Sequence, residues 1–165
     1  MSNDAGVNND AGVNNDARPS MEHILGHYTA MRTEMIGALT VALGEKQWGG
    51  SPNSPGPGRS AAGEGDPEAE AVGLVTQSFQ GTYPPGEWRR AADIVTAVGL
   101  RHGFTETGTI VDRPGDIEVY GDDVYGGRYV FGMAVNTILG VSTGGHRWDK
   151  RPPDEPTTDD DGSSA

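Results

Sequence analysis

The chain has 165 residues, a formal net charge of −12 and no cysteine. This length is enough for one domain with a hydrophobic core. The absence of cysteine excludes disulfides, thiolate metal sites and a cysteine nucleophile among these residues. Because there is no apolar run of about 18 residues, the sequence also predicts no transmembrane span.

The negative charge is concentrated in three segments. Residues 1–18 carry a net charge of −2, residues 63–71 of −4 and residues 152–165 of −5, which leaves −1 for the rest of the chain. A nucleic-acid-binding protein needs a basic face that displaces counterions from phosphates. The charge distribution therefore predicts no nucleic-acid partner, and it favours acidic segments that keep the protein soluble.

Composition divides the chain into a tether, one domain and a tail. Residues 1–18 contain the unit Asp-Ala-Gly-Val-Asn-Asn, which starts at Asp4 and again at Asp10. One valine per unit buries too little surface to offset the entropy of ordering the backbone, so a disordered tether is predicted. Calcium binding by the Asp and Asn oxygens is a weaker alternative. A single domain is predicted over 19–148, with a flexible, acidic Gly/Pro-rich loop at 49–71 and a disordered acidic tail at 149–165.

Two helices are predicted from apolar residues at spacings of three and four. The first spans about 20–43, with Ser20 as N-cap and Gly44 as C-cap. The second opens at Pro84-Pro85 and stops at Gly103. The apolar positions of the first helix are Ile24, Tyr28, Met31, Met35, Leu39 and Ala42, and those of the second are Trp88, Ala91, Ala92, Val95 and Val98.

Alternating and β-branched residues predict strands at 71–79, 105–111, 116–121, 128–135 and 137–143. The order is helix, strand, helix and then antiparallel strands. An antiparallel sheet of four to five strands with both helices on one face would bury both apolar stripes. The predicted fold class is therefore an α+β two-layer sandwich.

Candidate chemistry is sparse. His23 and His27 lie four residues apart on the first helix, near enough to share a metal, but residue 24 is isoleucine where a metalloprotease helix needs glutamate. No third ligand is indicated, so exposed helix histidines are the preferred interpretation. The glycines of the segment 143–147 resemble an anion-binding loop, but no helix follows them, and a strand end is favoured.

Four carboxylates surround one predicted hairpin, at Asp112, Asp116, Asp122 and Asp123. They could bind a cation or act as an acid–base pair, although turn residues and solvated strand ends explain them more simply. The three tryptophans fit core or rim packing better than a ligand platform; they are Trp48, Trp88 and Trp148. We predict no catalytic, cofactor-binding or metal-binding residues, no cofactor and no enzymatic activity.

Three segments carry a family resemblance. The stretch 28–35, continuing to Gly44-Glu45-Lys46-Gln47-Trp48, resembles the first helix of the LppA-like lipoproteins of mycobacteria and other actinobacteria. The block 88–95, ending at His102-Gly103-Phe104, resembles their second helix, and 137–144 resembles their last strand. The likeness covers about residues 20–148, and it implies neither enzymatic activity nor catalytic residues.

Two departures from the family concern cysteine. Members carry an N-terminal signal with a lipid-accepting cysteine, and this sequence shows neither. They also tend to carry one cysteine in the middle loop and one after the last Thr-Gly, at places that fall near Arg59-Ser60 and at Gly145 here. The loss of both together is expected if they pair with each other, and it fits a reducing compartment.

Two functions follow as expectations. One is a non-enzymatic lipoprotein-like domain of the cell envelope, on the outer face of the plasma membrane, if the true N-terminus lies upstream and carries the lipid anchor. The alternative is a soluble, cytoplasmic protein-binding module with acidic flexible segments, if Met1 is the true start. In the first case the domain binds an unidentified protein partner or simply occupies the surface, and in the second it binds an unidentified protein.

Overall fold

The computed structural model describes residues 18–51, 58–62 and 65–153. The repeat at 4–17 and the acidic residues beyond 153 lie outside this range, so their predicted disorder stays a prediction. Within the described residues, no helix combines the length and the apolarity needed to cross a bilayer.

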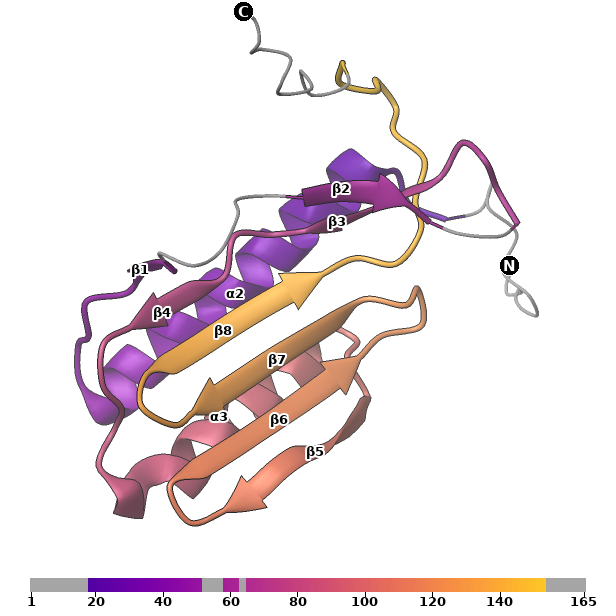
Figure 1. Cartoon of the computed structure of the whole chain (residues 1–165). Helices are drawn as coiled ribbons and strands as arrows, with labels where there is room; N and C mark the ends of the chain where they lie inside the picture. The colour runs from indigo at the N-terminus through magenta and orange to yellow at the C-terminus, as the bar shows by residue number, and fades with distance from the viewer. Residues whose placement is uncertain (1–17, 52–57, 63–64, 154–165) are drawn as a thin grey trace, which may run out of the picture.

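Two helices pack on one face of an antiparallel sheet, and the described residues place no helix on the other face, which we call the open face (Figure 1). The predicted α+β class is confirmed, although the sheet has eight strands rather than four or five. The elements in chain order are α2 (Met21–Leu43), β1 (Gly49–Gly50), β2 (Gly58–Ala61), β3 (Glu70–Gly73), β4 (Gln77–Phe79), η3 (Pro85–Glu87), α3 (Trp88–Arg101), β5 (Glu106–Arg113), β6 (Asp116–Asp122), β7 (Arg128–Met133) and β8 (Thr137–Ser142).

Helix α2 forms where its local signals place it. The Ser20 hydroxyl accepts a hydrogen bond from the His23 backbone N–H at 3.1 Å, which satisfies one of the free donors of the first turn. At the other end Gly44 has a φ of 102° and donates its N–H to the Thr40 carbonyl. The predicted bounds 20–43 agree with Met21–Leu43 to one residue. The buried residues of α2 are Met21, Ile24, Tyr28, Met31, Met35 and Leu39.

The sheet order is β1-β4-β8-β7-β6-β5. Strands β5 to β8 form a meander. Strand β8 pairs on its other side with β4 along 137–139 and with β3 at Ser142. The strand predicted at 71–79 is therefore two short strands, separated at 74–76. At this break the side chain of Arg32 on α2 donates a hydrogen bond to the Val75 carbonyl at 2.7 Å. This carbonyl is thus satisfied by a helix side chain and not by the backbone N–H of a neighbouring strand.

The described residues of the segment 49–71, for which a flexible loop is predicted, include short strands. The segment contains β1 and β2, and it leads into β3, which pairs with β2 from Gly58↔Gly73 to Ala61↔Glu70. Two of its acidic side chains are buried, since Asp66 is 6% exposed and Glu70 is 8% exposed. The Gly/Pro composition predicted a loop because these strands are held by backbone pairing, which leaves no side-chain signal in the local pattern.

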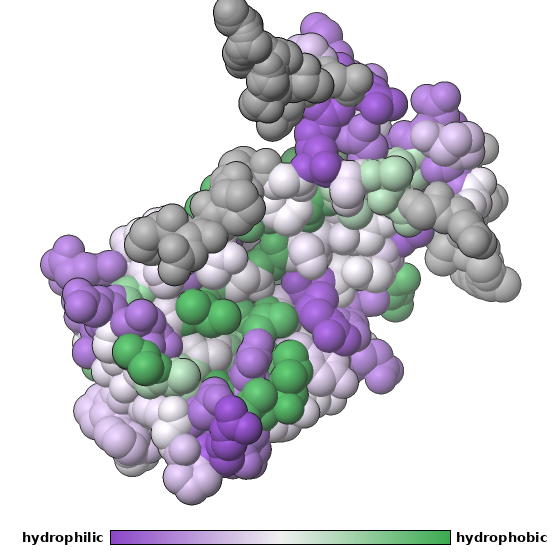
Figure 2. Space-filling view, in the orientation of Figure 1, coloured by the Kyte–Doolittle hydropathy of each residue, from purple (hydrophilic) through white to green (hydrophobic). Residues whose placement is uncertain are grey.

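One continuous core lies between the helices and the sheet, and Tyr129 and Phe131 of β7 are among its fully buried side chains. On the open face, hydrophobic residues gather over the middle of the sheet (Figure 2). A shallow groove of about 300 Å³ lies there beside the half-buried side chains of Leu74, Val130 and Ile138.

Candidate functional site

The two histidines of α2 do not form a metal site with a third ligand. His23 is exposed, whereas the His27 ring stacks edge-on with the His102 ring at 5.2 Å and its Nε2 lies 3.3 Å from the His102 carbonyl oxygen. No cluster of three potential metal ligands occurs among the described residues. His27 therefore serves contact between the two helices.

The four aspartates near the β5–β6 hairpin lie at opposite ends of β6, so they form no single cluster. Three make ion pairs with arginines: Asp112 with Arg89 at 3.5 Å, Asp116 with Arg113 at 3.0 Å and Asp122 with Arg128 at 2.6 Å. Asp123 instead accepts the backbone N–H groups of Tyr125 at 2.9 Å and Gly127 at 2.8 Å. Each carboxylate thus has its own partner.

A buried polar cluster forms where α2 begins, and it includes a residue of the predicted strand end. His146 is 1% exposed, and its Nδ1 lies 2.9 Å from the Pro19 carbonyl oxygen. Because a carbonyl only accepts, Nδ1 carries the proton and Nε2 is an acceptor. Burial lowers the pKa of His146. Nearby, the Tyr28 hydroxyl donates to the Asp123 carboxylate, and burial together with this bond raises the pKa of Tyr28.

A second polar cluster joins β2 and β3 to the end of the domain. Arg59 donates to both carboxylate oxygens of Glu70 at 2.9 and 3.3 Å. Arg151 pairs with the same carboxylate at 2.7 Å, and the Trp148 indole N–H donates to it at 2.9 Å. The hydrogen bonds from Arg59, then from Trp148, hold the pKa of Glu70 below its ordinary value. Trp148 therefore has a structural role.

Gly145, where the family resemblance implied one cysteine, lies beside Ala62, which follows the Arg59-Ser60 position implied for the other. A Cβ added to Gly145 would lie 2.8 Å from the Cβ of Ala62, and Glu70 on β3 exchanges both backbone hydrogen bonds with His146. The middle loop and the segment after β8 are thus neighbours in space, as a cross-link between them would require.

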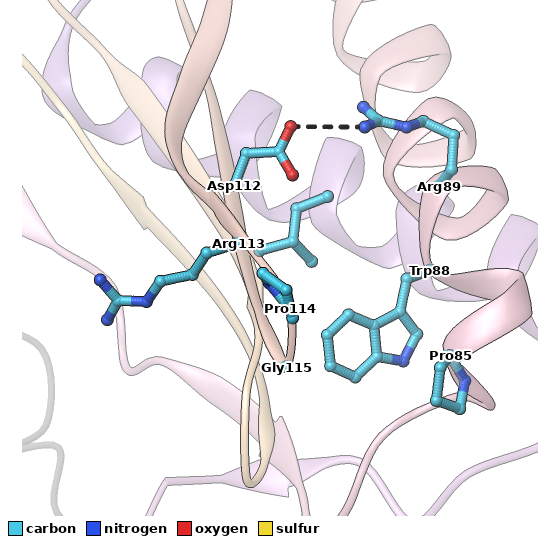
Figure 3. A pocket seen from close by; sticks show the side chains of 8 residues that line it. Pro85, Trp88, Arg89, Asp112, Arg113, Pro114 and Gly115 are labelled. Atoms are coloured by element: carbon cyan, nitrogen blue, oxygen red, sulfur yellow. Dashed lines mark ion pairs between the residues drawn. The ribbon is translucent and has the colours of Figure 1, made fainter.

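The strongest candidate for binding is a pocket between the start of α3 and the β5–β6 turn (Figure 3). Its volume is about 490 Å³, and its walls are largely apolar. This volume lies within the range of about 300–1,000 Å³ that small-molecule sites occupy. The lining residues include Pro85, Trp88, Arg89, Asp112, Pro114 and Ile117.

Trp88 forms one wall of this pocket, and its orientation is set by a hydrogen bond. Its indole N–H donates to the Tyr83 carbonyl at 2.6 Å, and the ring projects toward the turn at Pro114-Gly115 (Figure 3). Above the ring, the Arg89–Asp112 ion pair spans the gap between α3 and β5. The pocket therefore presents a fixed aromatic surface beneath one cation and one anion.

Sequence reasoning singled out Trp88 and Asp112 separately, and it treated both as structural. It did not identify Arg89, Pro85 or Pro114 as neighbours of either one. The signals that were available are the Pro84-Pro85 helix start and the turn Arg113-Pro114-Gly115. Nothing in the sequence pattern indicated that these two ends meet.

A protein-family model matches residues 10–146, which is most of the chain, and it describes a lipoprotein family, LppA, confined to pathogenic Mycobacterium. The chain belongs to the LppA family. The resemblance seen in the two helices and in the last strand is thereby confirmed. A comparison with curated protein sequences finds no match.

Two solved structures share the fold of this LppA-family chain. The putative lipoprotein LppA from Mycobacterium tuberculosis aligns with a TM-score of 0.64 at 13% identity, over 82% of this chain and 87% of that one. A DUF4853 family protein from Actinomyces odontolyticus aligns with a TM-score of 0.58 at 19% identity, over 88% of this chain and 78% of that one. At these identities the likeness establishes the fold.

Proposed function

We propose that this LppA-family domain is a non-enzymatic binding domain of the cell envelope, exposed on the outer face of the plasma membrane. Membership of a lipoprotein family supports the location. The repeat at 4–17 would suit a spacer between an anchor and the domain. Because the 165 residues hold no cysteine, a lipidated cysteine would have to precede them.

The pocket between α3 and the β5–β6 turn carries the binding part of the proposal. It has the size and the apolar walls of a ligand site, and its charged groups are the Arg89–Asp112 ion pair and Arg113, which pairs with Asp116. Among the described residues, the four aspartates considered as candidate chemistry are bound to structural partners, as Asp123 is to Tyr28. Noncovalent recognition fits this arrangement better than catalysis.

The location is tested by fractionating cells that express the untagged native protein and measuring the intact mass of its N-terminus. We expect a diacylglyceryl cysteine at the N-terminus of a membrane-associated species. A cytosolic species that begins at Met1 or Ser2 would contradict the envelope location.

One observation favours the alternative of a soluble, intracellular protein-binding module. Both cysteines that the family resemblance implied are absent, and ion pairs lie near their places, which suits a reducing compartment. The cytosolic outcome of the fractionation would support this alternative. A stable protein complex recovered from cytosol at physiological salt would then be the next observation to expect.

A further inference from the structure

We propose that the pocket between α3 and the β5–β6 turn binds a neutral saccharide, with one sugar ring stacked on Trp88. This inference rests on the proposed function in one respect, that the domain binds its ligand noncovalently. It adds the chemical class of the ligand and the residues that recognise it.

Trp88 gives the pocket an aromatic wall that suits one face of a sugar ring. The C–H groups of a sugar ring are polarised by the attached oxygens, and they match the negative face of an aromatic ring. The Trp88 indole N–H is already bonded to the Tyr83 carbonyl, so the ring offers its apolar surface to the pocket. Pro85 and Pro114 flank it with rigid rings. A wall that is already ordered lowers the entropic cost of binding.

The rim of the pocket carries two opposite charges close together. Arg89 and Asp112 contribute one positive and one negative group 3.5 Å apart, and the Arg113 side chain points to the other side of the hairpin (Figure 3). A strongly anionic or cationic ligand would meet one like charge as it entered. A ligand of neutral hydroxyl groups can instead accept from the guanidinium and donate to the carboxylate, so both groups stay satisfied.

Both rim side chains are accessible to a ligand. The side chain of Arg89 is 63% exposed and that of Asp112 is 59% exposed, whereas the Ile117 side chain behind them is buried. The pocket thus combines an apolar back, an aromatic wall and a polar mouth. This is the pattern of a site that buries one face of a sugar ring and hydrogen-bonds its edge.

The test is titration of the full purified chain with maltotriose, triacetylchitotriose, mannobiose and arabinotriose, observed by heteronuclear NMR. We expect at least one saccharide to shift the Trp88 indole N–H and the Gly115 amide at about 10 mM, which is tenfold above a Kd of 1 mM. Trp88→Leu keeps apolar bulk but removes the aromatic face, and it should weaken binding about tenfold. Asp112→Asn keeps the shape of the mouth but removes its anion, and it should weaken binding by a smaller factor.

Two matched variants serve as controls. Trp148→Leu makes the same change at an indole that packs against Arg59, and Asp93→Asn makes the same change at an exposed carboxylate of α3 outside the pocket lining. Both should bind as the native chain does. If no saccharide shifts the pocket signals, or if Trp88→Leu and Asp112→Asn bind unchanged, the inference is wrong.

A proline-rich peptide is the competing occupant, because aromatic-lined grooves also bind such segments. The probe is a peptide with the sequence of residues 151–158. Shifts of the Trp88 and Gly115 signals with this peptide, and none with saccharides, would overturn the inference. Because the titration uses purified protein, a cytosolic location would contradict the proposed location without changing the binding result, and failed binding would leave the location untouched.

Discussion

The Tyr28 hydroxyl donates a hydrogen bond to the Asp123 carboxylate, and this bond links the first half of α2 to the turn between β6 and β7. The contact depends on a close approach, since a Cβ added to Gly127 would lie 2.1 Å from the Tyr28 oxygen. The same carboxylate also accepts two backbone N–H groups of its own turn. One side chain therefore holds both the turn and the helix.

Replacing Tyr28 with Phe should lower the free energy of unfolding by about 1.5–3 kcal/mol, because a buried bond to a charged group is lost. Urea unfolding followed by circular dichroism measures the change. Tyr120→Phe, on a half-buried ring of the open sheet face, serves as the control and should change stability by less than about 0.5 kcal/mol. Equal effects of the two variants would mean that the Tyr28–Asp123 bond contributes no net stability.

Stability should fall as the pH drops below about 6.5, because of His146. Burial holds the pKa of His146 below its ordinary value of 6.5 in the folded chain. Below that pH the unfolded chain takes up a proton that the folded chain does not, so protonation favours unfolding. The slope can reach about 1.4 kcal/mol per pH unit until the folded pKa is reached.

Unfolding free energies measured at several pH values between 7.5 and 5 test whether His146 causes this pH dependence. His146→Phe should lower stability at pH 7.5, because the bond to the Pro19 carbonyl is lost, and it should flatten the pH dependence in this window. His23→Gln, at an exposed position, should leave the slope as it is. A slope that survives His146→Phe would assign the acid sensitivity to another group.

Glu70→Gln should loosen the segment after β8 from β2 and β3. The carboxylate binds Arg59, Arg151 and Trp148, and the amide cannot pair with both guanidinium groups. Because the Arg151 side chain is 49% exposed, water can replace part of the loss, and we expect about 1–2 kcal/mol.

Amide hydrogen exchange locates the effect of Glu70→Gln. In this variant the exchange rates should be higher in β2 and little changed in β6. Acid should act in the same direction. The pKa of Glu70 lies below its ordinary value of 4.5 in the folded chain, so its contribution is present above that pH and is lost as the pH falls through the folded pKa. Uniform acceleration of exchange across the sheet would contradict a local role.

The double variant Ala62→Cys/Gly145→Cys should form an intramolecular disulfide on oxidation. The built Cβ distance of 2.8 Å is shorter than the 3.5–4.5 Å range of disulfides, so the two segments must separate by about 1 Å. The cross-link should raise stability by about 2–4 kcal/mol minus the cost of this shift. Mass spectrometry of the alkylated protein detects it, with Ala62→Cys alone as the control. Two free thiols after oxidation would show that the segments cannot adjust.

Gly121→Ala should be strongly destabilising. A Cβ at this position would lie 2.3 Å from a Tyr129 ring carbon, and Tyr129 is fully buried between the sheet and α3. Overpacking of this kind costs about 1–3 kcal/mol. Gly132→Ala, on the adjacent strand, meets nothing closer than 3.4 Å and should be nearly neutral. Thermal unfolding of the two variants side by side measures the contrast, and similar melting temperatures would mean that Tyr129 can move.

The sequence by itself determined the helices, because their signals are local. Ser20 and Gly44 lie next to the residues they cap, and the spacing of Tyr28, Met31 and Met35 reports one buried face. The strands of the meander were predictable for the same reason, since alternation along β7 reflects one covered and one open face. These elements then permitted only a few layer arrangements.

Only the tertiary structure decided the rest, because it depends on contacts between residues far apart in the chain. Strand β1 exists through backbone pairing with β4, on the far side of the Gly/Pro-rich segment, and its two glycines do not signal this pairing. In the sequence, nothing distinguishes Glu70 from the other carboxylates of the loop. In the fold it is bound by Arg59, Trp148 and Arg151. The pocket also depends on tertiary packing, because Trp88 and Asp112 are brought together where α3 packs on the hairpin. Local sequence patterns do not predict such packing.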